Sequence, residues 1–188
     1  MVDEPMSERP GAEARITHAD DLEPQQVRAQ RHPDGSERSV WDRYFVISRE
    51  PGFVSMFTSW DAGVLVHRHG HMGHHVMYVL RGGMHCGDEW CGPGTHIEVP
   101  LGAAAGPFVA GPDGADIFEV TAGEGHSWEA DPDGFAALLA ERGVTPLPNP
   151  PITLPDWMED RRSDQSRLVR NASSDGAAPA GARGGGQR

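Results

Sequence analysis

Residues 66–83 read VHRHGHMGHHVMYVLRGG, and this stretch decides the fold that we expect. β-branched residues flank its histidines and two glycines interrupt it, so an extended conformation is favoured over a helix. In a strand, alternate side chains share one face, which places His67, His69 and His71 together. The stretch therefore predicts a strand that carries a row of imidazoles.

The surrounding sequence is rich in short strand signals separated by Gly, Pro and Asp. REPG at residues 49–52 predicts a turn between two strands. Many short strands with Gly/Pro turns are typical of an all-β antiparallel sandwich or barrel. The strand-like runs are at residues 43–48, 53–58, 63–69, 75–80, 84–86, 95–99, 106–111 and 116–123.

One helix is expected after these strands, near the C-terminal end. It covers residues 133–143, DGFAALLAERG, with Asp133 as N-cap and Gly143 as a left-handed C-terminal cap. The Pro-rich residues 144–157 are expected to lie as an extended arm. Residues 16–44 show no clear period, and no structure is assigned to them.

Composition sets the domain limits that we expect. Residues 1–15 and 163–188 are polar and Gly-rich, which predicts disorder, and a single domain occupies residues 16–162. The formal net charge of −12 argues against a nucleic-acid partner. No apolar run reaches the roughly 20 residues of a membrane span, so no membrane partner is expected. Without an apolar leader, the expected location is cytoplasmic.

Only two cysteines occur, Cys86 and Cys91, which is too few for a disulfide framework. Reduced, partly buried thiols are the expected state. A disulfide between them would require a suitable Cα separation, which the sequence does not give.

The spacing of the central stretch resembles the first motif of the cupin superfamily. Gly63, five residues, His69, one residue, His71, three residues, His75, six residues and Gly82 match that motif, except that the family has Glu where His75 stands. A second motif follows in outline at residues 94–105, where Ala105 replaces the family's fourth histidine. The resemblance implies a cupin-type double-stranded β-helix, or jelly-roll barrel, and a homodimer.

The same resemblance implies a metal centre. We expect His69, His71 and His75 to point inward from two adjacent strands, with a turn near residues 72–74 between them, and to hold one divalent transition metal. Three imidazoles suit Fe, Zn, Ni, Mn or Cu, and the sequence does not choose among them. The likeness also places His96 and Glu98 inside the barrel. Glu98 would be a compensating ligand, a partner of a ligating histidine or a catalytic base, with His96 as the other proton carrier.

The remaining histidines of this region are expected elsewhere. His67 should lie near the barrel mouth or solvent, His74 should point away from the site, and His85 should be exposed on a hairpin. Ala105 leaves two interpretations open. Losing the fourth ligand is how a non-catalytic relative would look, but a small residue also widens the pocket and frees a coordination position.

Three functions are compatible with these residues. The first is a metal-dependent enzyme acting on a small organic substrate, with dioxygenase chemistry favoured by analogy with three-His sites. A non-redox lyase, isomerase or cyclase would instead use the metal as a Lewis acid. The second function is a non-catalytic binding module. The third is a structural or interaction protein, in which residues 106–111 and the Pro-rich arm serve a dimer interface. Fold alone does not decide among these functions.

Overall fold

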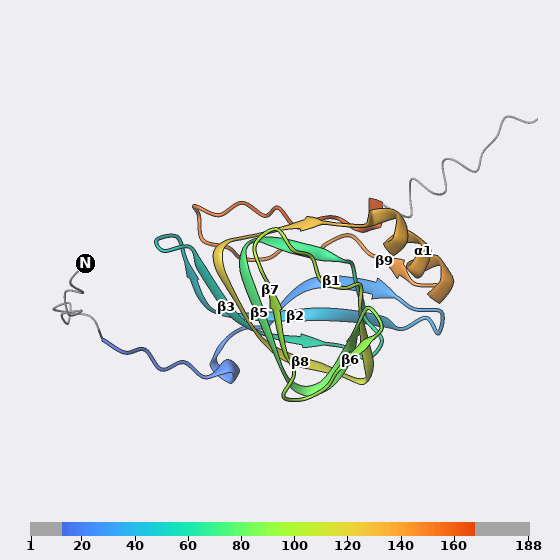
Figure 1. Ribbon diagram of the computed structural model, residues 1–188, viewed down its shortest axis with the longest axis horizontal. Helices are drawn as coiled ribbons and strands as arrows, with labels where there is room; N and C mark the ends of the chain where they lie inside the picture. The colour runs from blue at the N-terminus through green and yellow to red at the C-terminus, as the bar shows by residue number, and fades with distance from the viewer. Residues whose placement is uncertain (1–12, 168–188) are drawn as a thin grey trace, which may run out of the picture.

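The computed structural model describes residues 13–167, and its strands form one antiparallel sheet that curls around an interior (Figure 1). The strand order is β6-β5-β8-β3-β2-β1-β9, with β4 also paired to β8 and β7 to β5. This confirms the all-β jelly-roll class with one short helix. The elements are η1 (Ala19–Asp21), β1 (Gln25–Arg31), β2 (Glu37–Ser48), β3 (Phe53–Trp60), β4 (Leu65–Val66), β5 (His69–Cys86), β6 (Glu89–Cys91), β7 (His96–Val99), β8 (Phe108–Glu129), α1 (Pro132–Arg142) and β9 (Thr145–Pro146).

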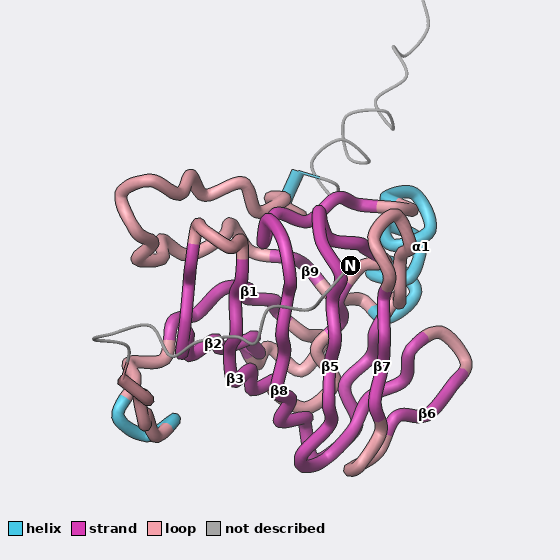
Figure 2. The backbone as a smooth tube through the Cα atoms, turned by 60° about the vertical axis from the view of Figure 1, so that its left-hand side comes forward, coloured by secondary structure: helices cyan, strands magenta, loops and turns pink. Residues whose placement is uncertain are grey.

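Strands β5 and β8 are longer than the sequence predicted. β5 joins the runs at 75–80 and 84–86 into 18 residues, and β8 joins the runs at 106–111 and 116–123 into 22 residues. The pairing between them shifts register at His71/Met72, Val79/Arg81 and Gly82/Met84. Such irregularities bend a strand without ending it, so the glycines that read as turns are bends within long strands. Figure 2 shows β3, β8, β5 and β7 side by side.

The turn predicted at residues 49–52 is confirmed, since β2 and β3 pair on either side of it. Residues 16–44, whose sequence shows no clear period, contain β1 and the start of β2. The interior is filled by apolar side chains from most of the strands. The buried ones are Val27, Val40, Trp60, Val64, Val66, Met77, Val79, Met84, Cys91, Phe108, Ala110, Ala115 and Ile117.

Helix α1 begins two residues earlier than predicted, at Pro132. Asp131, not Asp133, caps it and accepts a hydrogen bond from Gly134 N at 3.0 Å. Pro132 then occupies the first helical turn, where a missing N–H costs nothing. Gly143 closes the helix with φ 62°, as predicted. None of the helices within the described range has the length and apolar character needed to cross a membrane.

The Pro-rich arm is extended as expected, and it lies along the same edge of the molecule as α1 (Figures 1 and 2). Leu147 N donates to Ala29 O at 2.9 Å, which ties the arm to β1. The predicted boundary at Arg162 is wrong, because Gln165 and Ser166 are buried beyond it. The rest of the predicted tail, 168–188, and residues 1–12 lie outside the described residues.

Candidate metal centre

The three predicted histidine ligands lie on the interior side of a single strand. His69, His71 and His75 all belong to β5, so the expected turn between them and the origin on two strands are wrong. Alternation along one strand suffices to align the side chains, because all three positions are odd-numbered. The ring centroids of His69 and His71 are 5.3 Å apart, and those of His71 and His75 are 4.3 Å apart.

Two of these imidazoles are held in the tautomer that suits a metal ligand. His69 Nδ1 lies 2.9 Å from the carbonyl oxygen of His67, and His71 Nδ1 lies 3.1 Å from that of Gly125. A carbonyl only accepts, so each Nδ1 donates its hydrogen and each Nε2 keeps a lone pair. Burial lowers the pKa of His69 to about 4 and that of His71 to about 3, which keeps both rings neutral.

The third imidazole is paired with a carboxylate that sequence reasoning missed. His75 Nε2 lies 2.9 Å from Glu119 Oε2, and both residues are buried, at 2% and 6% exposure. Burial alone would raise the pKa of Glu119, but the hydrogen bond and charge of His75, followed by the other two histidines, hold it below its usual range. Glu119 pairs in register with the buried Met77. Strict alternation through the run at 116–123 was the signal that could have revealed it.

The expectation that His96 and Glu98 look into the barrel is wrong. In β7 they pair with Tyr78 and Val76, the outward positions of β5, and both are exposed. Cross-strand partners share a face, and a shift of one position exchanges the faces. Ile97 therefore takes the interior position, and neither His96 nor Glu98 reaches a molecule inside the barrel.

Ala105 occupies the position that the second motif implied. It forms a bridge with His69, in which His69 N donates to Ala105 O at 3.0 Å and Ala105 N donates to His69 O at 2.9 Å. The backbone of Ala105 thus lies beside the histidine-bearing strand β5, but only a methyl group extends from it.

Of the other histidines in this region, His67 lies elsewhere than predicted, whereas His74 and His85 lie as predicted. His67 is not near solvent but 1% exposed, with its ring 4.9 Å from that of His69 and its Nδ1 in contact with Gln165. Burial lowers the pKa of His67 to about 2. His74 and His85 are exposed, as predicted.

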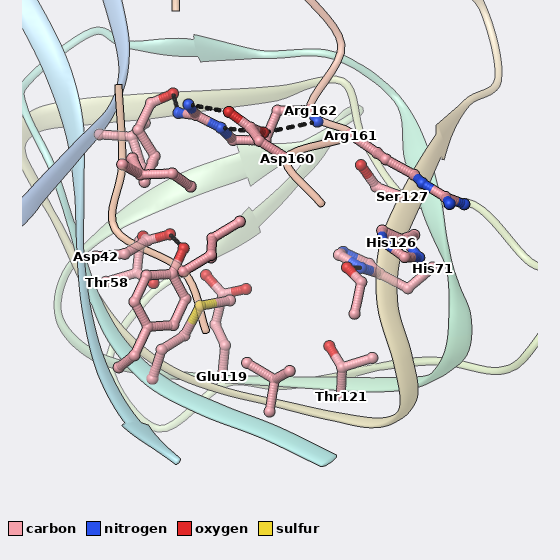
Figure 3. A pocket seen from close by; sticks show the side chains of 18 of the residues that line it. Asp42, Thr58, His71, Glu119, Thr121, His126, Ser127, Asp160, Arg161 and Arg162 are labelled. Carbon is pink, nitrogen blue, oxygen red and sulfur yellow. Dashed lines mark hydrogen bonds and ion pairs between the residues drawn. The ribbon is translucent and has the colours of Figure 1, made fainter. Parts of the chain in front are cut away.

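A cavity of about 160 Å³ lies between the histidines and the arm. Figure 3 shows Glu119, His71 and Asp42 around it, with Arg162 and Asp160, which follow the arm in sequence, on a further side. Its apolar walls include Val40, Val54, Met56, Trp60, Val66, Met77, Ile152, Leu154 and Met158. The arm thus closes a space that is mostly apolar and has a few polar groups, as ligand sites have.

Asp42 is a second buried carboxyl in this cavity. The Tyr44 hydroxyl donates to Asp42 Oδ2 at 3.0 Å. Burial, reinforced by the charge of Glu119, raises the pKa of Asp42 to about 7, and burial beside Asp42 raises the pKa of Tyr44 above its ordinary value. A carboxyl that titrates near neutrality can donate or accept a proton there.

Within residues 13–167, no three side chains among His, Cys, Asp and Glu are arranged to hold a metal ion as they stand. The His75 Nε2 atom, which a third ligand would use, is hydrogen-bonded to Glu119. His69 and His71 nevertheless suit a metal ion as ligands, since each has a neutral ring whose Nε2 makes no hydrogen bond to the described residues. Cys86 and Cys91 are both free thiols.

Comparison with solved structures places the fold. The chain resembles a candidate acetylacetone dioxygenase from Methylibium petroleiphilum PM1, with TM-score 0.52, 13% identity, and 68% of this chain and 88% of that chain covered. An RmlC-like cupin protein from Ralstonia eutropha JMP134 gives TM-score 0.47 at 15% identity, covering 72% and 92%. The chain has a cupin fold. The polyketide cyclase RemF from Streptomyces resistomycificus gives TM-score 0.45 at 20% identity, covering 84% and 94%. No protein-family model matches the sequence, and no curated protein matches it significantly.

Proposed function

We propose that the protein is a metal-dependent cupin enzyme that acts on a small organic molecule inside the barrel. The observation that supports it best is the pair His69 and His71, whose Nδ1 atoms are committed to backbone carbonyls while Nε2 stays uncommitted. Two neutral imidazoles beside an apolar cavity have no structural use for those lone pairs. A divalent transition metal would bind these Nε2 lone pairs, and Fe, Zn, Ni, Mn and Cu all accept imidazole ligands.

The remaining ligands come from the His75–Glu119 pair. Either His75 Nε2 or a Glu119 oxygen becomes available once the hydrogen bond between them opens, and both lie on the interior side of the barrel. Bound there, the ion would supply either O₂ chemistry or Lewis-acid polarisation of a carbonyl. The chain's own part is to orient the substrate, exclude water through the apolar walls, and move a proton at Asp42.

Dioxygenase chemistry is our first assignment. A set dominated by neutral imidazoles leaves an ion with high net charge and open positions, which suits a bidentate anionic substrate together with O₂. The similar fold of a candidate acetylacetone dioxygenase makes 1,3-diketones the first compounds to test.

A non-redox lyase, isomerase or cyclase is the second candidate, and one observation favours it. Asp42 has a pKa raised to about 7 and receives a hydrogen bond from Tyr44, so it can take a proton from carbon and return it. These two residues replace His96 and Glu98 in the proton-transfer role. The expected homodimer stays a prediction, which light scattering on the purified protein will test.

Metal content is the deciding measurement. Untagged protein is expected to carry a transition metal near one equivalent by mass spectrometry, and both His69→Ala and His71→Ala are expected to lose it. His74→Ala is the matched control, because His74 lies on the same strand with its side chain exposed on the other face. Metal-free parent protein, or equal metal in all three variants, would refute the proposal.

Turnover separates the two chemistries. O₂ uptake with diketones, catechols or flavonoids that is lost in the metal-depleted variants assigns a dioxygenase. Substrate conversion without O₂ uptake that is lost in Asp42→Asn assigns the proton-transfer alternative. Bound metal with neither reaction assigns the binding module.

A further inference from the structure

Arg28 places a guanidinium in the same cavity, and the metal site does not account for it. The residue lies on β1, where a register shift between Gln26 and Arg28 puts both Val27 and Arg28 on the cavity lining. Arg28 pairs with Val40, which in turn pairs with Trp60, and both of these partners also line the cavity. The guanidinium therefore belongs to the interior row of the sheet.

The Arg28 guanidinium makes no hydrogen bond within the described part of the chain. Its Nη1 atom is buried there without a hydrogen-bond partner. Burial is the main cause that lowers the pKa of Arg28 to about 10, while Asp42 and Glu129 raise it through charge alone, without a hydrogen bond. The side chain is thus still cationic at neutral pH. A buried guanidinium nitrogen without a hydrogen-bond acceptor is costly, and a bound anion would supply that acceptor.

Two other arginines, Arg161 and Arg162, line this cavity, and both already have partners. Arg161 pairs with Glu159 at 2.9 Å. Arg162 donates to Val27 O at 2.7 Å and Pro150 O at 2.6 Å, and it pairs with Asp160 at 2.7 Å. Those bonds tie the arm to β1. Arg28 is therefore the arginine of this cavity whose N–H groups are unused by the described part of the chain.

The position of Arg28 relative to the histidines indicates what it serves. Its charge contributes to lowering the pKa of His69, so the guanidinium and this imidazole lie within electrostatic range across the cavity. A molecule between them would meet the guanidinium on one side and the His69 and His71 Nε2 atoms on the other. The volume of about 160 Å³ is close to that of cavities that hold one benzene molecule.

We propose that Arg28 binds the carboxylate of a small, apolar organic acid whose body fills this cavity. Carboxylate and guanidinium match as planar groups with two parallel hydrogen bonds, and the surrounding walls are mostly apolar. A dianionic phosphate fits less well, because it would meet the buried carboxylate of Glu119. The inference names the substrate class for the function proposed above and rests on it.

Calorimetry with benzoate and its neutral counterpart benzamide tests the assignment at pH 7.5. We expect benzoate to bind the parent protein and benzamide to bind at least about tenfold more weakly, since hydrogen bonds to charged groups carry that much affinity. Arg28→Met is expected to lose benzoate binding by about tenfold or more. Arg31→Met is the matched control, because Arg31 is the exposed end of the same strand and should leave binding unchanged.

Repeating the titrations after chelation of metal separates this inference from the proposed function. Benzoate binding that survives chelation and is lost in Arg28→Met supports the Arg28 site, even if the protein proves to hold no metal. Binding abolished by chelation alone assigns the carboxylate to the ion and overturns the inference. So does equal affinity for benzamide, unchanged affinity in Arg28→Met, or no benzoate binding by the parent.

The test remains decisive even if the Arg28→Met variant fails to fold. The comparison of benzoate with benzamide uses only the parent protein. Arg28→Lys keeps the charge but loses the planar fork, so we expect its affinity for benzoate to lie between those of the parent and Arg28→Met. An Arg28→Lys variant that binds benzoate as tightly as the parent would exclude the bidentate geometry and overturn the inference.

Discussion

Replacing Asp42 by Asn should stabilise the protein at alkaline pH and leave it nearly unchanged at acidic pH. Folding raises the pKa of Asp42 from 3.8 to about 7, with burial as the main cause and the charge of Glu119 as the next. Asn has the same shape and never ionises. The variant therefore removes the cost of a buried negative charge and keeps the side-chain volume.

The size of the effect follows from the pKa difference. Between pH 3.8 and about 7 the unfolded chain has released the Asp42 proton while the native protein still holds it. Native stability therefore falls as the pH rises through this window, and the fall ends above the folded pKa. About three pKa units correspond to about 4 kcal/mol, which is the upper bound on the change.

Urea unfolding followed by tryptophan fluorescence measures this change. We expect Asp42→Asn and the parent to have similar free energies of unfolding at pH 4, and the variant to gain up to about 4 kcal/mol by pH 8. Asp156→Asn is the control, because Asp156 is exposed on the arm and should show no such trend. A constant difference between Asp42→Asn and the parent at all pH values would refute the assignment of Asp42 as a neutral, buried acid.

Three further outcomes are expected. Gly73→Ala should lower the melting temperature, because its Cβ would lie 2.4 Å from Ala122 O, a backbone atom that cannot yield, at a cost of about 1–3 kcal/mol or more. Gln165→Ala should lower the free energy of unfolding by about 1–3 kcal/mol, because it leaves the buried His67 ring without its hydrogen-bond partner. Truncation after residue 162 removes the same partner and should have the same effect. An unchanged melting temperature in either variant would contradict this. In metal-free Asp42→Asn protein, the free energy of unfolding should fall as the pH drops below 6.5, because burial lowers the pKa of His71 from 6.5 to about 3. The fall should reach up to about 1.4 kcal/mol per pH unit for each buried imidazole. A flat profile from pH 6.5 to 4 would contradict the neutral state of the rings.

Much of the site was predictable where only local spacing mattered. The one-residue gap between His69 and His71 requires that both face the same side of a strand, whatever the rest of the fold does. His75 also lies an even number of residues from His69 and His71. The predicted row of imidazoles is therefore present, although the predicted turn between them is wrong. The end of the helix was predictable as well, because Gly143 is the residue that readily takes a positive φ.

Errors arose where the result depended on register between strands. His96 and Glu98 alternate with apolar residues, and the sequence does not state which pair faces inward. Pairing of β7 with β5 settles that question, and it turns both side chains outward. The resemblance to the cupin motifs suggested the opposite face, and a difference of one position reverses every side chain in a strand.

The sequence by itself determined an all-β fold with a row of histidines on one strand face, because strand alternation and turn chemistry are local properties of the chain. The cupin-type barrel followed from the resemblance to the cupin motifs. Only the tertiary structure brought Glu119 to His75 across 44 residues and placed Asp42 and Arg28 at the same cavity. Those residues come from β8, β2 and β1, and each would pass for an ordinary surface charge in its own segment. Their shifted pKa values arise mainly from burial and from neighbours that the fold brings close, which no local pattern of residues encodes.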